Sequence, residues 1–466
     1  MGDPRYISTR GQSPAASFED VLLTGLARDG GLYVPETWPQ FSHADLTAMK
    51  DLDYPALVHR VVSPFIGDAI PSDGLKALIV DAYATFDAPD VLPLKKLRDG
   101  EYLLELFHGP TLAFKDVAMQ LLGRLFDYVL NKHGQRVTIV GATSGDTGPA
   151  GIEACRDKDA IDIFTLFPAG RVSPVQEAQM TTVLSPNVHN IALDGTFDDC
   201  QDRVKDLFND LAFRDAHKLS AVNSINWARV MAQIVYYFWA ALKLGGPDKP
   251  VSFSVPTGNF GNVFAGYAAK QMGLPIAKLV VGSNSNDILA RFFLSGAMEM
   301  ADVVPTLSPS MDIQVSSNFE RLLFDLMDRD GAACAKTVTA FRETGQFRVT
   351  GAQLQRARKI FAGASFDDVE TKIIIKQVLD ESGEMIDPHT AVGVGAARAH
   401  KSDDGTPMVI LATAHPAKFA DGVESATGIR PALPERLADL LDRPRRCQNL
   451  ANNLDQLKRH IETTLS

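Results

Sequence analysis

The feature that most constrains the fold is a repeated order of strand, loop and helix between residues 135 and 281. Short runs rich in β-branched residues alternate with stretches whose apolar residues recur at helical spacing. The strand-like runs are residues 135–141, 161–167, 188–193, 251–255 and 278–281. Strands joined through helices pair in parallel because each connection must cross back over the sheet. We therefore predict an α/β fold with mostly parallel sheets and helices on both faces.

The remaining chain is divided around this region. Residues 1–95 are predicted to form a mainly helical N-terminal domain, in which Ser17 and Asp20 begin a helix with a capping box. Residues 96–430 form the predicted catalytic α/β region, in which residues 140–225 are expected to be a mobile small domain that closes over a ligand. Residues 431–466 are charged and read as a C-terminal helical tail.

Composition excludes several classes of protein. A formal net charge of −11 disfavours nucleic acid and anionic membranes as general partners, since both attract a basic surface. The longest apolar segment, residues 231–244, is too short to span a bilayer, and we expect no signal peptide. Four widely spaced cysteines without a Cys-x-x-Cys pair predict free thiols and a cytoplasmic location. These cysteines are Cys155, Cys200, Cys334 and Cys447.

Lys115 is the strongest candidate for a reactive side chain. Apolar residues recur at helical spacing from Phe114 onward, after a break at residues 109–111, so Lys115 falls in the first turn of a predicted helix. The partial positive charge at a helix N-terminus disfavours an ammonium group, and we expect the pKa of Lys115 to be lowered. Such a lysine can act as a nucleophile. The residues alone also allow a solvated surface lysine.

A second candidate is the loop after the strand at 251–255. Its glycines let backbone N–H groups approach a ligand, and the following helix presents its positive end to an anion. The loop consists of Gly258, Asn259, Phe260, Gly261 and Asn262. It matches neither the P-loop nor the dinucleotide-binding pattern. The residues alone leave two readings, a phosphate cradle or a structural turn.

Two further loops follow predicted strands. Ser144, Asp146 and Thr147 offer hydroxyls and a carboxylate that suit a polar ligand group, although a tight turn with Asp146 as a helix N-cap is an alternative. Thr413 ends an apolar strand, so we expect its hydroxyl to face a partner in a partly buried site.

No spacing of ligands predicts a metal site, and no Gly-x-Ser-x-Gly turn predicts a serine hydrolase. The reactive groups are thus one lysine and one anion cradle. A pyridoxal 5′-phosphate enzyme needs this combination, because a lysine forms a Schiff base with the aldehyde of the cofactor and a cradle holds its phosphate.

Three motifs, in this order, resemble those of the threonine synthase family, in its longer branch. They are residues 108–116 (HGPTLAFKD), 143–148 (TSGDTG) and 256–261 (PTGNFG). The similarity runs over most of the chain, from Tyr6 to Phe419. It implies the fold type II architecture of pyridoxal phosphate enzymes. It also implies conversion of O-phospho-L-homoserine and water to L-threonine and phosphate.

The resemblance also assigns roles to matching positions. Lys115 would form the Schiff base and move protons as both base and acid, and Thr413 would face the pyridine nitrogen. The cofactor phosphate would lie in the loop of Gly258, Asn259, Phe260, Gly261 and Asn262. The substrate groups would be held by two further sets, Ser144 and Thr147 for the carboxylate, and Asn223, Ser224 and Arg229 for the phosphate.

Two positions depart from the family pattern, and other functions stay open. Asp146, placed at the cofactor, stands where the shorter branch has an asparagine that bonds the 3′-oxygen, and some long-branch members have aspartate in place of Asn262. A phospho-lyase that releases 2-oxobutanoate would use the same residues. A non-catalytic phosphoester-binding protein is the alternative from another class. We expect a monomer or a homodimer.

Overall fold

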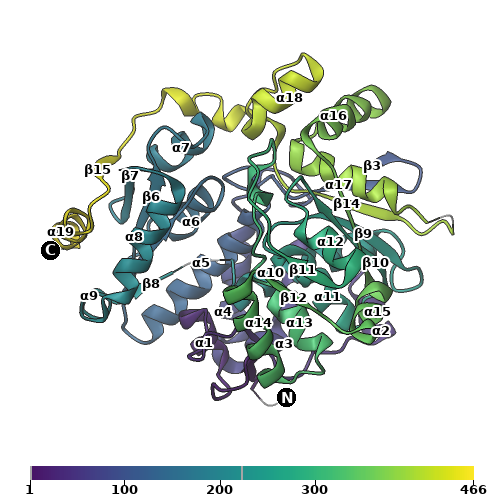
Figure 1. Ribbon diagram of the computed structural model, residues 1–466, viewed down its shortest axis with the longest axis horizontal. Helices are drawn as coiled ribbons and strands as arrows, with labels where there is room; N and C mark the ends of the chain where they lie inside the picture. Colours follow the sequence, from purple (N-terminus) through teal and green to yellow (C-terminus); the bar gives the residue numbers. More distant parts are fainter. Residues whose placement is uncertain (1–2, 222–223, 403, 466) are drawn as a thin grey trace. The chain divides into compact units, whose positions relative to one another are not determined.

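The structure is a computed structural model that describes residues 3–221, 224–402 and 404–465 (Figure 1). Its chain divides into two compact units, and each is made of two separate stretches. The first unit contains Met1–Ala118 and Ser224–Pro431, and the second contains Met119–Asn223 and Ala432–Ser466. The boundary passes through the first turn of helix α5 (Lys115–Lys132). The predicted mobile segment, 140–225, falls almost wholly in the second unit, and its mobility stays a prediction.

The first unit contains a six-stranded sheet in the order β13-β10-β9-β14-β4-β3. All neighbouring pairs are parallel except β3 and β4, which confirms the predicted mostly parallel sheet. The strands are β3 (Leu94–Arg98), β4 (Glu101–Glu105), β9 (Val251–Pro256), β10 (Ile276–Ser283), β13 (Phe361–Ser365) and β14 (Met408–Ala412). The carboxyl ends of β9 and β14 lie side by side, because Ile410 is in register with Ser254.

Helices cover both faces of this sheet, as predicted. Val280 of β10 lies in an apolar cluster with Val394 of α17 (Pro388–Ala399). The preceding residue, Leu279, lies 2.9 Å from the position that a Cβ on Gly266 of α11 (Gly261–Gln271) would take. Successive side chains of a strand point to opposite faces, so α17 and α11 lie on different sides of the sheet.

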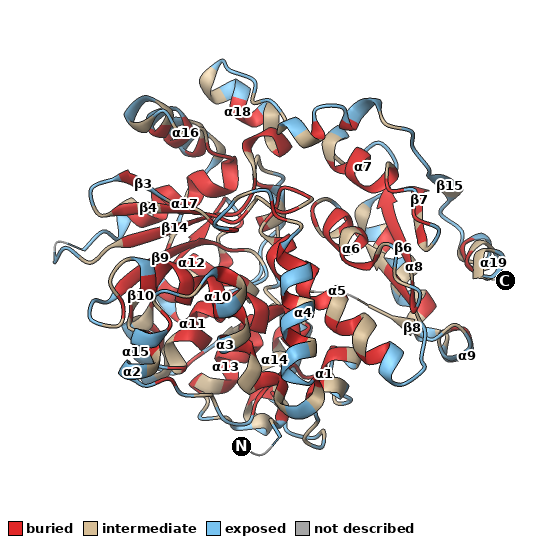
Figure 2. Cartoon of the chain, turned by 180° about the vertical axis from the view of Figure 1, so that it is seen from behind, coloured by how far each residue is buried: buried red, intermediate tan, exposed pale blue. Residues whose placement is uncertain are grey.

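The N-terminal segment is mainly helical, and Ser17 forms the predicted capping box with Asp20. Its elements are β1 (Tyr6–Ser8), α1 (Phe18–Thr24), β2 (Tyr33–Pro35), α2 (His43–Ala48), α3 (Tyr54–Ile66) and α4 (Ser72–Tyr83). Helix α3 packs on α10 (Trp227–Lys243). Nearly all of α10 is buried (Figure 2), and its exposed residue is Lys243 at the C-terminal end.

The rest of the first unit consists of short elements around the sheet. They are α12 (Ile288–Ser295), β11 (Ala297–Glu299), η2 (Pro309–Met311), α13 (Phe319–Leu326), α14 (Gly331–Thr344), β12 (Gln346–Arg348), α15 (Gly351–Ile360), α16 (Asp368–Ser382), η3 (Pro416–Phe419) and α18 (Ala420–Thr427).

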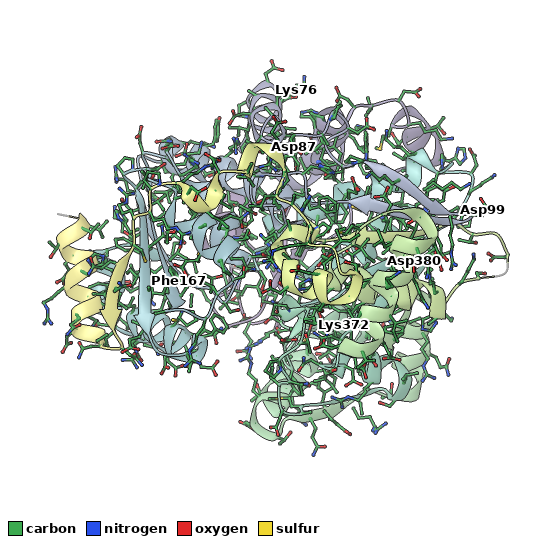
Figure 3. The ribbon with its side chains drawn as sticks, turned by 90° about the horizontal axis from the view of Figure 1, so that it is seen from above. Lys76, Asp87, Asp99, Phe167, Lys372 and Asp380 are labelled. Atoms are coloured by element: carbon green, nitrogen blue, oxygen red, sulfur yellow. The ribbon has the colours of Figure 1, made fainter. Side chains whose placement is uncertain are left out.

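The second unit has a five-stranded, wholly parallel sheet in the order β15-β7-β6-β5-β8. Its strands are β5 (Val137–Ala142), β6 (Ile161–Pro168), β7 (Val188–Asp194), β8 (Leu219–Ser220) and β15 (Gln448–Ala451). Its helices beside α5 are α6 (Thr147–Cys155), α7 (Pro174–Thr181), α8 (Phe197–Asn209), α9 (Leu211–Ala216) and α19 (Leu454–Leu465). Phe167, near the end of β6, is buried among the side chains of this unit (Figure 3).

The C-terminal segment contributes more than the predicted helix. Strand β15 pairs with β7, and Leu457 and Ile461 of α19 enter the same apolar cluster as Phe164 of β6. The division of the chain at residues 95 and 430 stays a prediction.

Within the described ranges, no helix is long and apolar enough to cross a membrane. No group of three or more potential ligand side chains could hold a metal ion in that part of the chain.

Candidate functional site

Lys115 lies at the carboxyl end of β14, where three backbone hydrogen bonds join two loops. Leu106 N–H donates to Ala412 (3.0 Å), Phe114 N–H donates to Thr413 (2.8 Å) and His415 N–H donates to Leu112 (3.0 Å). Helix α5 begins at Lys115, as its spacing predicts, and the residue is only 9% exposed. Lys115 and Thr413 are therefore brought together, and Lys115 is no solvated surface lysine.

The turn before Lys115 is closed by the next residue in the chain. The buried Asp116 carboxylate accepts hydrogen bonds from the backbone N–H (2.8 Å) and the hydroxyl (2.7 Å) of Thr111. Lys418 donates to the Thr111 carbonyl at 2.6 Å. A Cβ on Gly109 would lie 2.4 Å from that of Asp116, so only glycine fits there. The backbone that presents Lys115 is thus fixed from both sides.

The glycine-rich loop leaves the carboxyl end of β9, the strand next to β14. Phe260 takes the left-handed conformation (φ 63°), and α11 begins at Gly261. A Cβ on Gly258 would lie 2.7 Å from the Ser310 carbonyl oxygen, so this close approach also requires glycine. N–H groups in the first turn of a helix have no partner inside the helix and are available to an anion.

Asn262, in the first turn of α11, has one amide atom satisfied and one unsatisfied. Its Oδ1 accepts hydrogen bonds from the hydroxyls of Tyr236 and Tyr237 of α10. Burial raises the pKa of both tyrosines well above their usual range, so both hydroxyls keep their protons. Nδ2 of Asn262 is buried and has no partner among the residues that the structure describes. An unpaired buried donor costs about 1–3 kcal/mol, which a bound acceptor would recover. The loop therefore fits the phosphate of pyridoxal phosphate.

Arg229 lies on α10, two turns before Tyr236. It is 4% exposed, its Nη1 has no hydrogen-bond partner, and the described part of the chain offers it no carboxylate. Burial lowers the pKa of Arg229 to about 10, against the opposing influence of Tyr236, so the guanidinium is still charged at neutral pH. A buried, unpaired charge is costly, and this one fits an anionic ligand.

Ser224 lies beside the glycine-rich loop. Its carbonyl and that of Asn259 accept hydrogen bonds from the same amide group, Nδ2 of Asn318, at 3.1 and 3.0 Å. Asn223, the other candidate in this segment, lies outside the described residues. The first unit thus brings Ser224 to the predicted phosphate cradle.

Ser144, Asp146 and Thr147 lie in the second unit, between β5 and α6. Ser144 is exposed and Thr147 is half-buried. The buried Asp146 carboxylate accepts a hydrogen bond from Nε2 of Gln176 (2.9 Å), and its side chain does not cap α6. Asp146 does occupy the N-cap position of α6, as the alternative reading expects, but without a capping hydrogen bond to its side chain.

Sequence reasoning missed several residues that support the site. Tyr236 and Tyr237 donate to Asn262, Asn318 donates to the Asn259 carbonyl of the loop, and Arg321 in turn donates to Asn318. Each of these four residues is polar and lies within or next to an apolar helix. A polar residue in such a helix is the sequence feature that could have identified them as candidates. Their partners are far away in sequence, so spacing alone does not reveal them.

Comparison with known proteins identifies the family. Three family models match, namely Threonine synthase N terminus over residues 5–83, Pyridoxal-phosphate dependent enzyme over 92–340 and Threonine synthase, C-terminal, over 390–461. A threonine synthase of Pseudomonas aeruginosa is 54% identical over 98% of both chains. A crystal structure of PLP-bound threonine synthase from Brucella melitensis has 52% identity and a TM-score of 0.98 over 99% of both chains. Yeast threonine synthase has 42% identity and a TM-score of 0.95, over 99% of this chain and 98% of its own. The chain belongs to the threonine synthase family of pyridoxal-phosphate-dependent enzymes.

Proposed function

We propose that this protein converts O-phospho-L-homoserine and water to L-threonine and phosphate. The observation that carries the proposal is the buried Arg229 guanidinium, which is charged at neutral pH and has no carboxylate partner in the described chain. It lies on the helix that also holds Asn262 of the cofactor loop. A phosphate-bearing substrate next to the cofactor would supply the missing anion.

The cofactor is pyridoxal 5′-phosphate. The loop Gly258–Asn262 would hold its phosphate through helix N–H groups and Nδ2 of Asn262, Lys115 would bond its aldehyde, and Thr413 would face its ring nitrogen. When bound, the cofactor stabilises negative charge that develops on the substrate carbon next to the amine. The role of Asp146 at the ring stays a prediction.

The remaining site residues would bind and orient the substrate. Arg229 and Ser224, together with Asn223, would take the substrate phosphate, because a guanidinium forms paired, charge-assisted hydrogen bonds with phosphate oxygens. Ser144 and Thr147 would take the carboxylate, an assignment that rests on the family resemblance.

Lys115 would move the protons. Its amine would remove the proton from the substrate Cα and return it to the same carbon later. One group does both tasks best when its pKa is close to the working pH. The position of Lys115 at the start of α5 supports this, since the helix N-terminus favours the neutral amine.

The direct test is to incubate the protein and pyridoxal phosphate with O-phospho-L-homoserine and to measure phosphate, threonine and 2-oxobutanoate separately. We expect equal amounts of phosphate and threonine. Phosphate with 2-oxobutanoate instead would identify a phospho-lyase, and binding without any product would identify a non-catalytic protein.

Cell location and assembly are predictions of the same proposal. All four cysteines are free, which agrees with a cytoplasmic protein. Size-exclusion chromatography with light scattering would distinguish the expected monomer or homodimer from larger assemblies.

A further inference from the structure

Asn318 and Arg321 form a buried polar pair at the start of α13. Asn318 directly precedes the helix, Arg321 lies in its first turn, and both side chains are fully buried. Neither residue is among those that we propose to touch the cofactor or the substrate. Two large polar groups in an apolar interior must be kept there by their partners.

The partners fix the orientation of the Asn318 amide. Nη1 of Arg321 donates to Oδ1 of Asn318. A guanidinium can only donate, so the oxygen of the amide must face it and the nitrogen must face the other way. There, Nδ2 has two hydrogens and meets two carbonyls, that of Asn259 at 3.0 Å and that of Ser224 at 3.1 Å.

One amide group therefore bridges two segments with different proposed tasks. Asn259 belongs to the loop that would hold the cofactor phosphate, and Ser224 belongs to the segment that would hold the substrate phosphate. The junction has no spare room, because a Cβ on Gly261 would lie 3.2 Å from Nδ2 of Asn318 and 3.7 Å from the Ser224 carbonyl oxygen.

Arg321 extends the bridge on the substrate side. Its Nη2 donates to the Ile225 carbonyl at 2.6 Å, and its Nε donates to the Tyr33 carbonyl of the N-terminal segment at 2.9 Å. Burial lowers the pKa of Arg321 to about 9, against the opposing influence of Glu320, so the guanidinium keeps its charge at neutral pH. A charged donor holds these carbonyls more firmly than a neutral one would.

We propose that Asn318 and Arg321 are positioning residues that set the spacing between the two phosphate sites. The part of this inference that concerns the substrate rests on the proposed function. The pair makes cofactor binding and substrate-phosphate binding depend on each other, because a shift of either segment moves the shared amide. It also gives the N-terminal segment a link to the site through Tyr33.

The informative substitution is Asn318→Asp. It keeps the size of the side chain and its contact with Arg321, but it places an acceptor oxygen against the carbonyls of Asn259 and Ser224. We expect the Kd of the apoenzyme for pyridoxal phosphate to rise about tenfold, and the KM for O-phospho-L-homoserine at saturating cofactor to rise about tenfold as well. Arg321→Lys, which keeps the charge but cannot reach three acceptors, should change both constants in the same direction.

Ser316→Ala is the matched control. The Ser316 hydroxyl donates to the Gly258 carbonyl at 2.7 Å, so it supports the cofactor loop alone. We expect this substitution to raise the Kd for pyridoxal phosphate and to leave the KM at saturating cofactor within about twofold. A change confined to the cofactor constant in Asn318→Asp, as in the control, would overturn the proposal.

A readout without turnover separates this inference from the proposed function. The absorbance of the bound cofactor is followed while the holoenzyme is titrated with O-phospho-L-homoserine. A wild-type protein that shows the spectral shift but makes no threonine would refute the proposed function, and a weaker shift in Asn318→Asp would still support the bridge. Equal titration curves for the two proteins, or no shift with either, would overturn the bridge.

Discussion

Arg229 combines a cost in stability with the role in substrate binding that we propose for it. Its charge is buried without a partner in the described structure, and this costs the empty protein free energy. We predict that Arg229→Met raises the free energy of unfolding by about 1–2 kcal/mol and raises the KM for the phosphate substrate at least about 100-fold. Urea unfolding of the apoenzyme and steady-state kinetics measure the two effects. Loss of stability in this variant would contradict the assignment.

Lys115 and Lys418 are both buried lysines of the first unit, and we expect them to have different roles. The ammonium of Lys418 donates to the Thr111 carbonyl, which makes it a support of the loop. We predict that Lys115→Ala abolishes both the visible absorbance of bound cofactor and turnover, whereas Lys418→Met keeps the absorbance. Absorption spectra of the two dialysed variants show which of them still holds the cofactor. Retained absorbance and activity in Lys115→Ala would rule out Lys115 as the Schiff-base lysine.

Strand β4 ends in a buried carboxylate whose protonation affects stability. Burial alone would raise the pKa of Glu105, but hydrogen bonds from His108 and Lys95, both at 2.8 Å, outweigh it and hold the pKa below its usual value. As the pH falls, the Glu105 carboxylate therefore becomes protonated in the unfolded chain at a higher pH than in the folded chain. The stabilisation is complete above the unfolded pKa, near 4.3, and is lost as the pH falls through the lower folded value.

We predict that Glu105→Gln lowers the free energy of unfolding by about 1 kcal/mol at pH 7. The expected loss is this small because Lys95 is partly exposed, and solvent weakens its ion pair with Glu105. The difference from the wild type should shrink below about pH 4. Urea unfolding at several pH values measures it. Glu36→Gln is the control, because the exposed pair of Glu36 with Arg5 (3.7 Å) should contribute almost nothing. A difference that does not depend on pH would contradict the prediction.

The elements that could be predicted are those with a strong local pattern. Apolar residues make up all of β14 and most of the interior strands β6 and β9, and the sequence alone locates these strands within a few residues. Strand β3 was missed because three of its five residues are charged, as suits an edge that should not pair with other chains. The start of α5 at Lys115 was predictable from spacing. The bridge from Asn318 to Ser224 and Asn259 was not, because it joins residues that are 94 and 59 positions apart.

At the scale of the whole molecule, the C-terminal segment completes the second unit. Leu457 and Ile461 are fully buried in its core, and β15 pairs with β7. We predict that a chain ending at Pro431 loses the cooperative unfolding of this unit and retains that of the first. Differential scanning calorimetry with limited proteolysis would show this. A truncated protein whose residues 119–223 resist protease as well as the full chain does would contradict the prediction.

The interleaving of the two units has a consequence for biosynthesis. Residues 119–223 leave the ribosome before most of the first unit is made, yet their sheet lacks β15 until residues 448–451 have been translated. Until then β7 is an open edge with unpaired N–H and C=O groups, a surface on which a strand of another nascent chain can pair. A molecular chaperone that shields this edge during translation would raise the yield of native protein most at high expression, when neighbouring nascent chains are numerous.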